Sequence, residues 1–520
     1  MRSGRALLAM LVTAALLTAC APDFDSAWKP PAWPASQLHF IDQPPAPIDT
    51  SGIALNPQRL RNDALGVQAR FAYLPGRGPA VDAFNTMVED FVRSAIDART
   101  AAVGLAYVPT AQARGSGMAD RGCNAGSATR PAAEILADAA YGPSGGAGVA
   151  VVCEIEYAGG PFLAERMRAV STGADGVISD TSLSIYVDTS TGQTAVAAEL
   201  WVDTAALSVT REIIDLLRRG AGGLSLRPAQ PDDDAQVTMV REALSWAGVD
   251  VRGGVTVKIP AGFDSAQLSQ LGLARTSESM SLEISPDSAT ALLSAFGAKV
   301  QSFAGQPYTG PGTVRAGRER VDCALVACVA LTYDDGPSVF TPSILGALAE
   351  RHSAATFFPM GENAAKYRDV LARTVAEGHE VENHTWNHPR LTTLSASRVS
   401  TQIRDATRAL NDATGAEVGV FRPPYGLYTD SVLAAAGLAA ILWDVDTFDW
   451  QSPRDEALVS RAVDQPGPGS IVLMHDVQPG TARTAAAVYD GLIDRGFTLV
   501  TVAQLFGGVL PSSGAWRHGP

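Results

Sequence analysis

The sequence predicts an α/β fold in which a distorted (β/α)7 barrel at the C-terminus follows a separate α+β domain. Three observations predict the barrel: short apolar runs recur at regular spacing, helical patterns separate most of them, and polar residues follow most of them. Seven such strands make one fewer than the eight-stranded type. The runs lie at 329–333, 355–358, 379–383, 419–422, 439–443, 470–474 and 498–501.

Length and composition bound the protein class. The chain has 520 residues, which is too long for one ordinary core and predicts two or three domains. A hydrophobic fraction of 46% with 18% charged residues indicates a globular protein. The formal net charge of −14, with no basic stripe, disfavours nucleic acid as a partner. These quantities leave the oligomeric state open.

The N-terminus has the pattern of a targeting segment. Arg2 and Arg5 precede the apolar run 6–17, which is too short for a comfortable membrane span. The sequence Leu-Thr-Ala-Cys at 17–20 resembles a bacterial lipobox, and a plain secretory signal is the alternative. We therefore expect residues 1–20 to be a lipoprotein signal peptide and Cys20 to be lipidated. The protein would then face the cell wall from the cytoplasmic membrane.

The remaining chain divides by composition. Residues 21–50 are rich in Pro and Ala and predict an extended tether. Residues 51–305 predict an α+β accessory domain with a wall-binding or spacer role. Gly and Pro in 306–320 predict a linker. We expect residues 321–507 to form the barrel and residues 508–520 to form a tail. Within 51–305 we expect helices over 79–99, 209–219 and 288–296, a hairpin over 183–201, and strands over 255–259 and 281–284.

Four cysteines follow Cys20, and four cysteines allow three pairings. An exported protein can form disulfides. We expect Cys123 to pair with Cys153 and Cys323 with Cys328, because each pair lies within one region of the chain. A zinc site built on Cys323 and Cys328 is a weaker alternative, since no second pair follows nearby.

Two adjacent acids, Asp334 and Asp335, end the first barrel strand. An isolated pair of this kind is most often a polar turn, because such turns are common. Adjacent carboxylates also repel each other unless a cation or an arginine holds them. His384 and His388 follow the third strand, spaced so that both imidazoles can face one metal ion from a helical turn. One Asp and two His would leave coordination positions open for water and substrate.

Further polar residues end later strands. Arg422 ends the fourth strand and is a candidate partner for one of the two acids. Asp444, Asp446 and Asp449 follow the fifth strand. His475 ends the sixth and, beside an Asp from another strand end, is a candidate general acid. The alternatives without a functional role are a surface salt bridge for Arg422 and a core histidine for His475.

These motifs in order resemble those of the polysaccharide deacetylases, the NodB-homology domains of carbohydrate esterase family four. The motifs are Thr332-Tyr-Asp-Asp335, His384-Thr-Trp-Asn-His388, Arg422-Pro-Pro-Tyr-Gly426, Asp446-Thr-Phe-Asp-Trp450 and Leu473-Met-His475. Five motifs in order are highly specific, although each alone is weak. The resemblance covers about residues 321–506, and Tyr333 stands where the family usually has Phe.

The resemblance implies a role for each residue. Asp335, His384 and His388 would hold one divalent ion, Zn²⁺ in first place, with Co²⁺ or another divalent ion as the alternative. Asp334 would be the general base, positioned by Arg422. His475, supported by Asp449 and not by Asp444, would be the general acid. The Tyr425 backbone N–H would stabilise the oxyanion, and Trp450 and Leu473 would line the acetyl pocket.

The resemblance also implies an activity. We expect metal-dependent removal of N-acetyl groups from amino sugars of a cell-wall polysaccharide, with peptidoglycan as the leading substrate. An O-acetyl esterase acting on xylan or another glycan is one alternative. A catalytically inactive barrel acting as a wall-binding or sensor lipoprotein is another. The layout of 51–305 faintly resembles the small extracellular α+β domains found beside wall-modifying deacetylases and in anti-sigma factor sensors.

Overall fold

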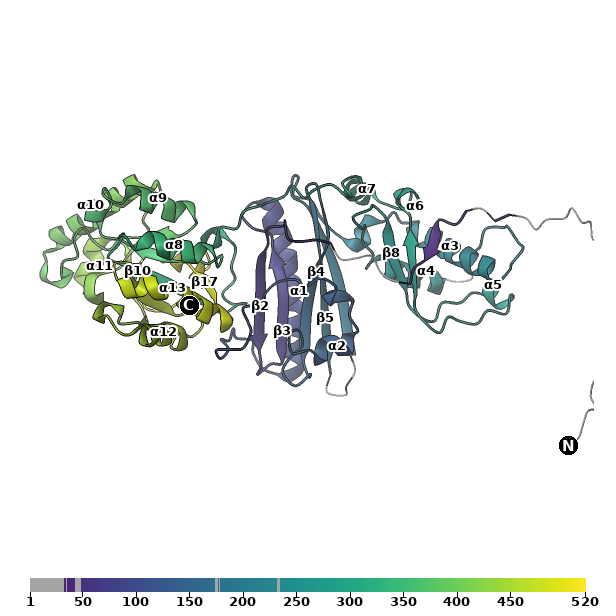
Figure 1. Cartoon of the computed structure of the whole chain (residues 1–520), viewed down its shortest axis with the longest axis horizontal. Helices are drawn as coiled ribbons and strands as arrows, with labels where there is room; N and C mark the ends of the chain where they lie inside the picture. The colour runs from purple at the N-terminus through teal and green to yellow at the C-terminus, as the bar shows by residue number, and fades with distance from the viewer. Residues whose placement is uncertain (1–31, 34, 43–47, 174–175, 177, 232–233) are drawn as a thin grey trace, which may run out of the picture.

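The computed structural model describes residues 32–520 except 34, 43–47, 174–175, 177 and 232–233. The expected lipidation site Cys20 and most of the expected tether lie outside the described residues. Among the described helices, none is long and apolar enough to cross a membrane. Figure 1 shows three bodies in a row: a barrel at one end, a six-stranded sheet in the middle and a smaller α+β module at the other end.

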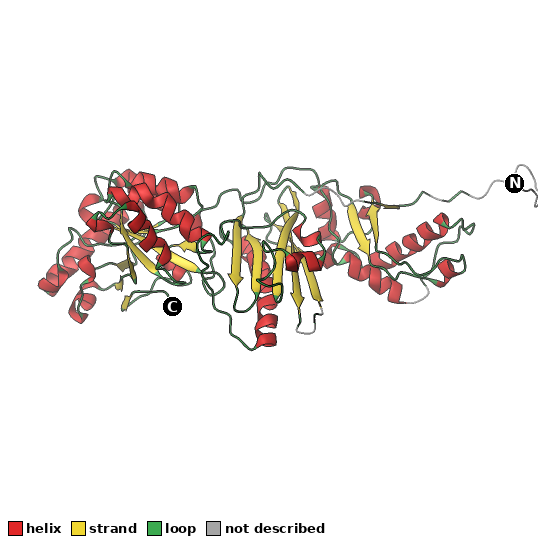
Figure 2. Ribbon diagram, turned by 60° about the horizontal axis from the view of Figure 1, so that its bottom comes forward, coloured by secondary structure: helices red, strands yellow, loops and turns green. Residues whose placement is uncertain are grey.

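The C-terminal body is the predicted barrel, and each of the seven predicted runs contains a strand. Helices surround these strands (Figure 2), and all pairings between named strands of this body are parallel. The strands are β10 (Cys328–Asp334), β11 (Thr356–Phe358), β12 (Glu380–Val381), β13 (Val420–Phe421), β14 (Ala439–Ile441), β15 (Val445–Asp446), β16 (Ile471–His475), β17 (Thr498–Val500) and β18 (Ala515–Trp516). The helices are α8 (Thr341–Ala349), α9 (Arg368–Ala376), α10 (Ala396–Thr414), α11 (Asp430–Ala436), α12 (Asp455–Asp464), α13 (Pro479–Asp494) and α14 (Val502–Leu505).

The barrel is distorted because its strands form two separate ladders. One ladder runs β12-β11-β10-β16-β15, with β17 also on β10, and the other runs β13-β14-β18. A single bridge between Asn383 and Phe421 joins them on one side. Strand β18 lies within the expected tail 508–520, so this segment contributes a strand to the barrel.

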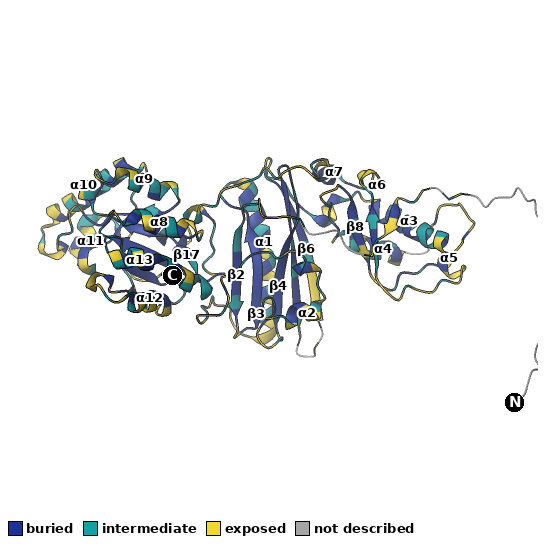
Figure 3. Cartoon of the chain, in the orientation of Figure 1, coloured by how far each residue is buried: buried dark blue, intermediate teal, exposed yellow. Residues whose placement is uncertain are grey.

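The middle body is a six-stranded sheet with one long helix on its face. Most residues of its central strands are buried, apolar and polar alike, and these strands appear dark blue in Figure 3. The helix α1 (Pro79–Val103) packs Phe84, Val88 and Val92 against one face. The short α2 (Ala132–Ala137) packs against the other. The strands, in spatial order, are β2 (Asn56–Asn62), β3 (Val67–Tyr73), β4 (Val149–Gly159), β5 (Phe162–Thr172), β6 (Ile178–Asp188) and β7 (Thr194–Val196).

The third body is a small module around a three-stranded sheet of order β1-β9-β8. Its first strand, β1 (Leu38–Phe40), lies within the expected tether and pairs with β9 far along the chain, a pairing that no local pattern predicts. Residues 51–305, expected as one domain, therefore carry two sheets. The other elements are α3 (Ala205–Gly220), α4 (Asp234–Leu244), β8 (Val255–Ile259), α5 (Ala266–Ser269), β9 (Met280–Ile284), α6 (Pro286–Thr290) and α7 (Ala295–Ser302).

The barrel and the middle sheet share one hydrophobic core. Leu325 and Val326 at the start of the barrel belong to the same buried cluster as Phe84 of α1. The Tyr107 hydroxyl donates to the Leu325 carbonyl oxygen at 2.6 Å. In the expected linker 306–320, Glu319 is buried and accepts from the Gly76 backbone N–H at 2.7 Å. This segment therefore packs between two bodies.

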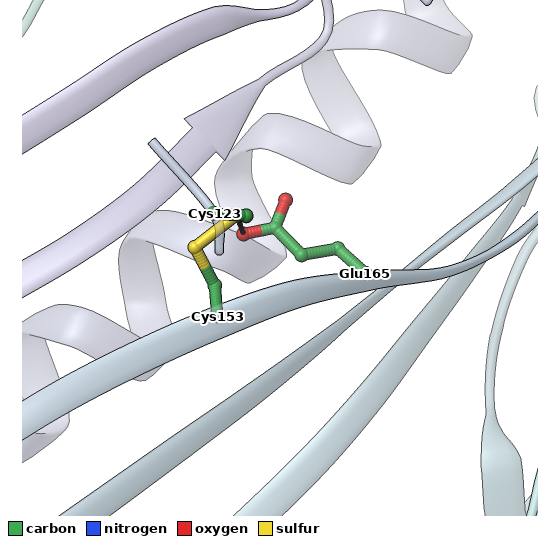
Figure 4. A group of neighbouring side chains, drawn as sticks. All are labelled: Cys123, Cys153 and Glu165. Atoms are coloured by element: carbon green, nitrogen blue, oxygen red, sulfur yellow. Dashed lines mark hydrogen bonds between the residues drawn. A yellow bond between two sulfur atoms is a disulfide. The ribbon is translucent and has the colours of Figure 1, made fainter. Parts of the chain in front are cut away.

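Both expected disulfides, Cys123–Cys153 and Cys323–Cys328, are present. Figure 4 shows the first of them beside the carboxylate of Glu165 in the middle sheet. Sulfur atoms bonded to each other are not free thiolates, so this group does not form a metal site. Burial raises the pKa of Glu165 to about 8, against one hydrogen bond from the Ala72 backbone N–H.

This pKa predicts how the stability of the middle sheet depends on pH. The pKa of Glu165 rises on folding from 4.5 to about 8. The contribution of Glu165 to folding stability is therefore fully present below pH 4.5 and is lost as the pH rises to about 8. We expect Glu165→Gln to remove this loss. The melting temperature of the variant should therefore exceed that of wild type by more at pH 8 than at pH 5. Thermal unfolding between pH 5 and pH 9 measures it, with the exposed Glu350→Gln as control. Identical pH slopes for wild type and Glu165→Gln would contradict the assignment.

Candidate active site

The turn after β10 places two acids at the carboxyl end of this central strand. Asp334 is the last residue of β10, and Asp335 begins the turn with a φ of 71°. The side-chain amide of Asn363 donates to the carbonyl oxygens of Asp335 and Gly336, at 3.3 and 3.2 Å. A Cβ atom on Gly336 would lie 2.1 Å from the Asp476 carboxylate, so this position requires glycine.

The loop after β12 carries the two histidines. His384 is buried and His388 half-buried, with ring centroids 4.9 Å apart. The residues between them form a turn instead of the expected helical turn, and His388 has a φ of 60°. The side-chain oxygen of Gln402 on α10 accepts from the backbone N–H groups of Trp386 and Asn387, at 2.9 and 3.2 Å. These bonds hold the loop so that both rings face Asp335.

Asp335, His384 and His388 fit a metal ion. Their ligand atoms lie within 4.8 Å of one another. The Oδ1 atom of Asp335 is 3.5 Å from His384 Nε2 and 3.6 Å from His388 Nε2. Two ligand atoms about 2.1 Å from a tetrahedral ion would be separated by about 3.4 Å, which matches both distances. The same Oδ1 atom is buried and has no hydrogen-bond partner among the described residues.

The protonation state of this group also fits metal binding. The Nδ1 atom of His384 lies 2.8 Å from the Arg422 carbonyl oxygen, so Nδ1 carries the hydrogen and Nε2 presents its lone pair to the site. Burial opposes ionisation of Asp335, but the neighbouring His384, with smaller effects of His475 and His388, lowers its pKa to about 2. Asp335 is therefore a carboxylate at neutral pH, the form in which it could bind a metal ion.

Arg422 holds the other acid. Its guanidinium is fully buried, and Nη1 donates to Asp334 Oδ1 and to Thr332 Oγ1, both at 2.8 Å. The second carboxylate oxygen of Asp334 lies 3.7 Å from His384 Nε2. Asp334 thus turns one oxygen to the arginine and the other toward the metal-ligand group, as a base beside the ion requires.

A buried histidine–aspartate pair lies at the end of β16. His475 Nδ1 is 2.8 Å from Asp449 Oδ1, and the His475 backbone N–H donates to Asp449 Oδ2 at 2.7 Å. The Thr481 hydroxyl also donates to Oδ2, at 2.6 Å. Asp444, the other candidate partner, instead accepts from Ser470 Oγ at 2.7 Å. The structure therefore pairs His475 with Asp449.

The environment of His475 suits a general acid. Burial lowers the pKa of His475, but the Asp449 hydrogen bond and charge, together with the charges of Asp334 and Asp335, outweigh it and raise the pKa to about 9. The ring is therefore protonated at neutral pH. With Nδ1 bound to Asp449, Nε2 is the nitrogen that can donate a proton to a substrate.

The three expected substrate-binding residues differ in exposure. Tyr425 is 57% exposed, has a φ of 62°, and packs its ring 4.6 Å from that of His388. Trp450 is 52% exposed beside the buried Asp449. Leu473 is buried in β16, two residues before His475. Tyr425 and Trp450 thus offer exposed aromatic surface beside His388 and Asp449.

Four residues that position these groups were not expected from the sequence. Each makes a hydrogen bond: Thr332 to Arg422, Asn363 to the acidic turn, Gln402 to the histidine loop and Thr481 to Asp449. Thr332 stands within the first of the five motifs, two residues before Asp334. In a strand this spacing puts both side chains on the same face, which could have marked Thr332 as a neighbour of Asp334. The other three are polar residues on helices or in a helical turn, where no pattern separates them from surface residues.

Comparisons with known proteins identify the family of the barrel. The profile of the polysaccharide deacetylase family matches residues 323–441. A chitooligosaccharide deacetylase from Sinorhizobium fredii (strain NBRC 101917 / NGR234) is 42% identical over 194 residues, which cover 90% of that relative and 34% of this chain. The chain belongs to the polysaccharide deacetylase family.

Two further matches are to one peptidoglycan deacetylase, once by sequence and once by structure. The peptidoglycan-N-acetylmuramic acid deacetylase PdaC of Bacillus subtilis (strain 168) is 38% identical over 178 residues, and the match covers 34% of this chain and 38% of that relative. A solved structure of PdaC is 37% identical with a TM-score of 0.35, covering 35% of this chain and 91% of the solved one. Each match spans about a third of this chain.

Proposed function

We propose that this polysaccharide deacetylase family member hydrolyses N-acetyl groups on amino sugars of peptidoglycan. The observation that supports this most is the joint placement of a base and an acid around a metal-ligand group. Asp334 is fixed by Arg422 on one side of Asp335, and the protonated His475 carries Asp449 behind it. Amide hydrolysis needs a base for the attacking water and an acid for the leaving amine.

Asp335, His384 and His388 would hold a divalent ion. Two imidazoles and one carboxylate favour Zn²⁺, with Co²⁺ as a substitute. When bound, such an ion lowers the pKa of water and polarises a carbonyl group. The Oδ1 atom of Asp335 already stands from each histidine Nε2 at the distance that a tetrahedral ion needs, so its binding requires little rearrangement of this carboxylate.

The other residues divide the proton transfers. Asp334 accepts the proton of the water that attacks the acetyl carbon, and the hydrogen bond from Arg422 orients its carboxylate. The Tyr425 backbone N–H is the proposed donor to the oxyanion, where a donor is worth about 10²–10³ in kcat. His475 Nε2 gives its proton to the amine as the C–N bond breaks. Trp450 and Leu473 line the proposed pocket for the acetyl methyl group.

Arg390 favours an anionic wall polymer over neutral chitin. Its exposed guanidinium stacks on Tyr425, 5.4 Å from the ring centroid, and Tyr425 in turn packs on His388. Among the described residues, Arg390 has no acidic partner. Peptidoglycan carries carboxylates on its peptides, which a free guanidinium beside the cleft can bind, whereas chitin carries none.

Arg390→Gln should therefore raise the KM for peptidoglycan by about 2- to 5-fold, the size of one exposed ion pair. The KM for N-acetylglucosamine oligomers should stay unchanged, because these oligomers lack the carboxylate. Steady-state acetate release from both substrates measures the difference. The control is Arg408→Gln, which replaces an exposed arginine on α10. Equal changes for the two substrates would contradict a carboxylate-binding role.

The proposed location is the outer side of the cytoplasmic membrane, with Cys20 lipidated and the barrel facing the wall. The proposal rests on the N-terminal sequence pattern and on a substrate that lies outside the membrane. The two bodies formed by residues within 51–305 would act as a wall-binding or spacer region between the anchor and the barrel. Metabolic labelling with a fatty acid, compared between wild type and Cys20→Ala, tests the anchor.

Acetate release from peptidoglycan, N-acetylglucosamine oligomers and acetylxylan tests the activity. We expect release from peptidoglycan that stops on chelation and returns with Zn²⁺. Faster release from acetylxylan would instead favour an O-acetyl esterase. A metal-free protein that releases acetate from none of them would favour an inactive, wall-binding barrel and overturn the proposal.

A further inference from the structure

The C-terminal segment closes one side of the barrel. Strand β18 pairs in parallel with β14, in register Ala440–Ala515 and Ile441–Trp516. Beyond β18 the chain reaches the start of β16, where the Gly519 backbone N–H donates to the Gly469 carbonyl oxygen at 2.8 Å. The segment thus pairs along β14 and reaches the start of β16, whose strand partners are β10 and β15.

Strand β14 depends on this partner. Without β18 it would pair only with β13, which has two residues, and that pair joins the main ladder by one bridge between Asn383 and Phe421. A two-stranded ribbon with an open edge is marginally stable. With β18 in place, the Ala440 N–H donates to the Gly514 carbonyl oxygen at 2.8 Å, so β14 is paired along both edges.

The same strand positions Arg422. The Leu442 N–H donates to the Trp516 carbonyl oxygen at 2.7 Å. The other side of that peptide group, the Ile441 carbonyl oxygen, accepts from Arg422 Nε at 2.9 Å. The Leu442 carbonyl oxygen accepts from Arg422 Nη2 at 3.0 Å, and Nη1 holds Asp334 at 2.8 Å. One rigid peptide group therefore separates the C-terminal strand from the guanidinium that orients the base.

We propose that β18 is a positioning element of the active site: it fixes the β14 carbonyl groups that aim Arg422 at Asp334. This inference rests on the proposed deacetylase function and adds a part of the chain, 511–520, that lies outside the five motifs. The guanidinium is fully buried, with its central carbon 4.2 Å from the Phe358 ring centroid, and among the described residues it donates to the carbonyl oxygens of Ile441 and Leu442 and to the side-chain oxygens of Thr332 and Asp334. A shift of β14 therefore moves the base.

Truncation after Leu510 tests the proposal. We expect kcat on peptidoglycan to fall by about 10- to 100-fold, because a displacement of roughly 1 Å costs about that much, while KM and bound metal stay unchanged. Hydrogen exchange at the Leu442 amide should accelerate, since its acceptor is gone. Trp516→Ala is the matched control: it loses the ring contact with Phe506 but keeps the backbone acceptor, so kcat should remain near wild type.

A double-mutant cycle separates positioning from general destabilisation. In an Arg422→Lys background the truncation should cost little further kcat, because the guanidinium that β18 aims is already absent. If the truncated chain does not fold, Gly514→Val replaces it in the cycle. Gly514 has a φ of 83°, which a β-branched residue resists, so this variant displaces the carbonyl oxygen that accepts from Ala440.

Two outcomes would overturn the role of β18. One is an unchanged kcat in a variant whose Leu442 amide exchanges rapidly. The other is an equal loss of kcat from the truncation in wild-type and Arg422→Lys backgrounds. Both differ from failure of the proposed function, which would appear as a full-length chain that releases no acetate from any substrate.

Discussion

Asp334→Asn is expected to abolish turnover while the protein keeps its metal. An amide has nearly the size of a carboxylate, and its oxygen can still accept from Arg422 Nη1, so the fold and the arginine stay in place. The amide cannot accept a proton from water. Loss of a general base typically costs about 10²–10⁴ in rate. Asp335, the proposed carboxylate ligand, is unchanged, so metal content should remain near one ion per chain.

Acetate release together with metal content measured by atomic absorption checks this prediction. The matched variant is Asp335→Asn, which should lose both activity and metal because its Oδ1 atom faces both histidines. Loss of metal from Asp334→Asn, with metal retained by Asp335→Asn, would show that the two adjacent acids have the opposite roles.

Asp449→Asn is expected to move the alkaline limb of the pH–rate profile to lower pH and to lower kcat at pH 8. The Asp449 carboxylate is the main cause that raises the pKa of His475, against burial, to about 9. A general acid works only while protonated, so a lower pKa reduces the active fraction as the pH rises. An asparagine can also donate to Nδ1 and so favour the wrong tautomer, which adds to the loss.

A pH series of kcat/KM between pH 5 and pH 10 measures the shift. Thr481→Val provides a graded control, because it removes one of the hydrogen bonds to Asp449 and leaves the carboxylate in place. The control should move the limb by less than Asp449→Asn does. An alkaline limb at the same pH in wild type and Asp449→Asn would show that His475 does not titrate as the essential acid.

The strand ends of the barrel were readable from the sequence because the signals are local. A buried strand followed by charged residues marks a catalytic edge in parallel folds, so Asp334, Arg422 and His475 stood out without coordinates. The middle sheet was harder. Its strands β2 to β5 include polar residues that other segments bury, such as Gln68 and Glu165, so their pattern lacked a clear alternation.

By itself, the sequence determined the barrel, the two disulfides, and the chemical types that meet at its carboxyl edge. Only the tertiary structure decided how those residues are paired. It divides Asp334 from Asp335 by giving one to Arg422 and the other to both histidines, and it selects Asp449 over Asp444 for His475. It also brings β18 to β14. These contacts join residues tens of positions apart, where distance in space, and not local pattern, sets the partner.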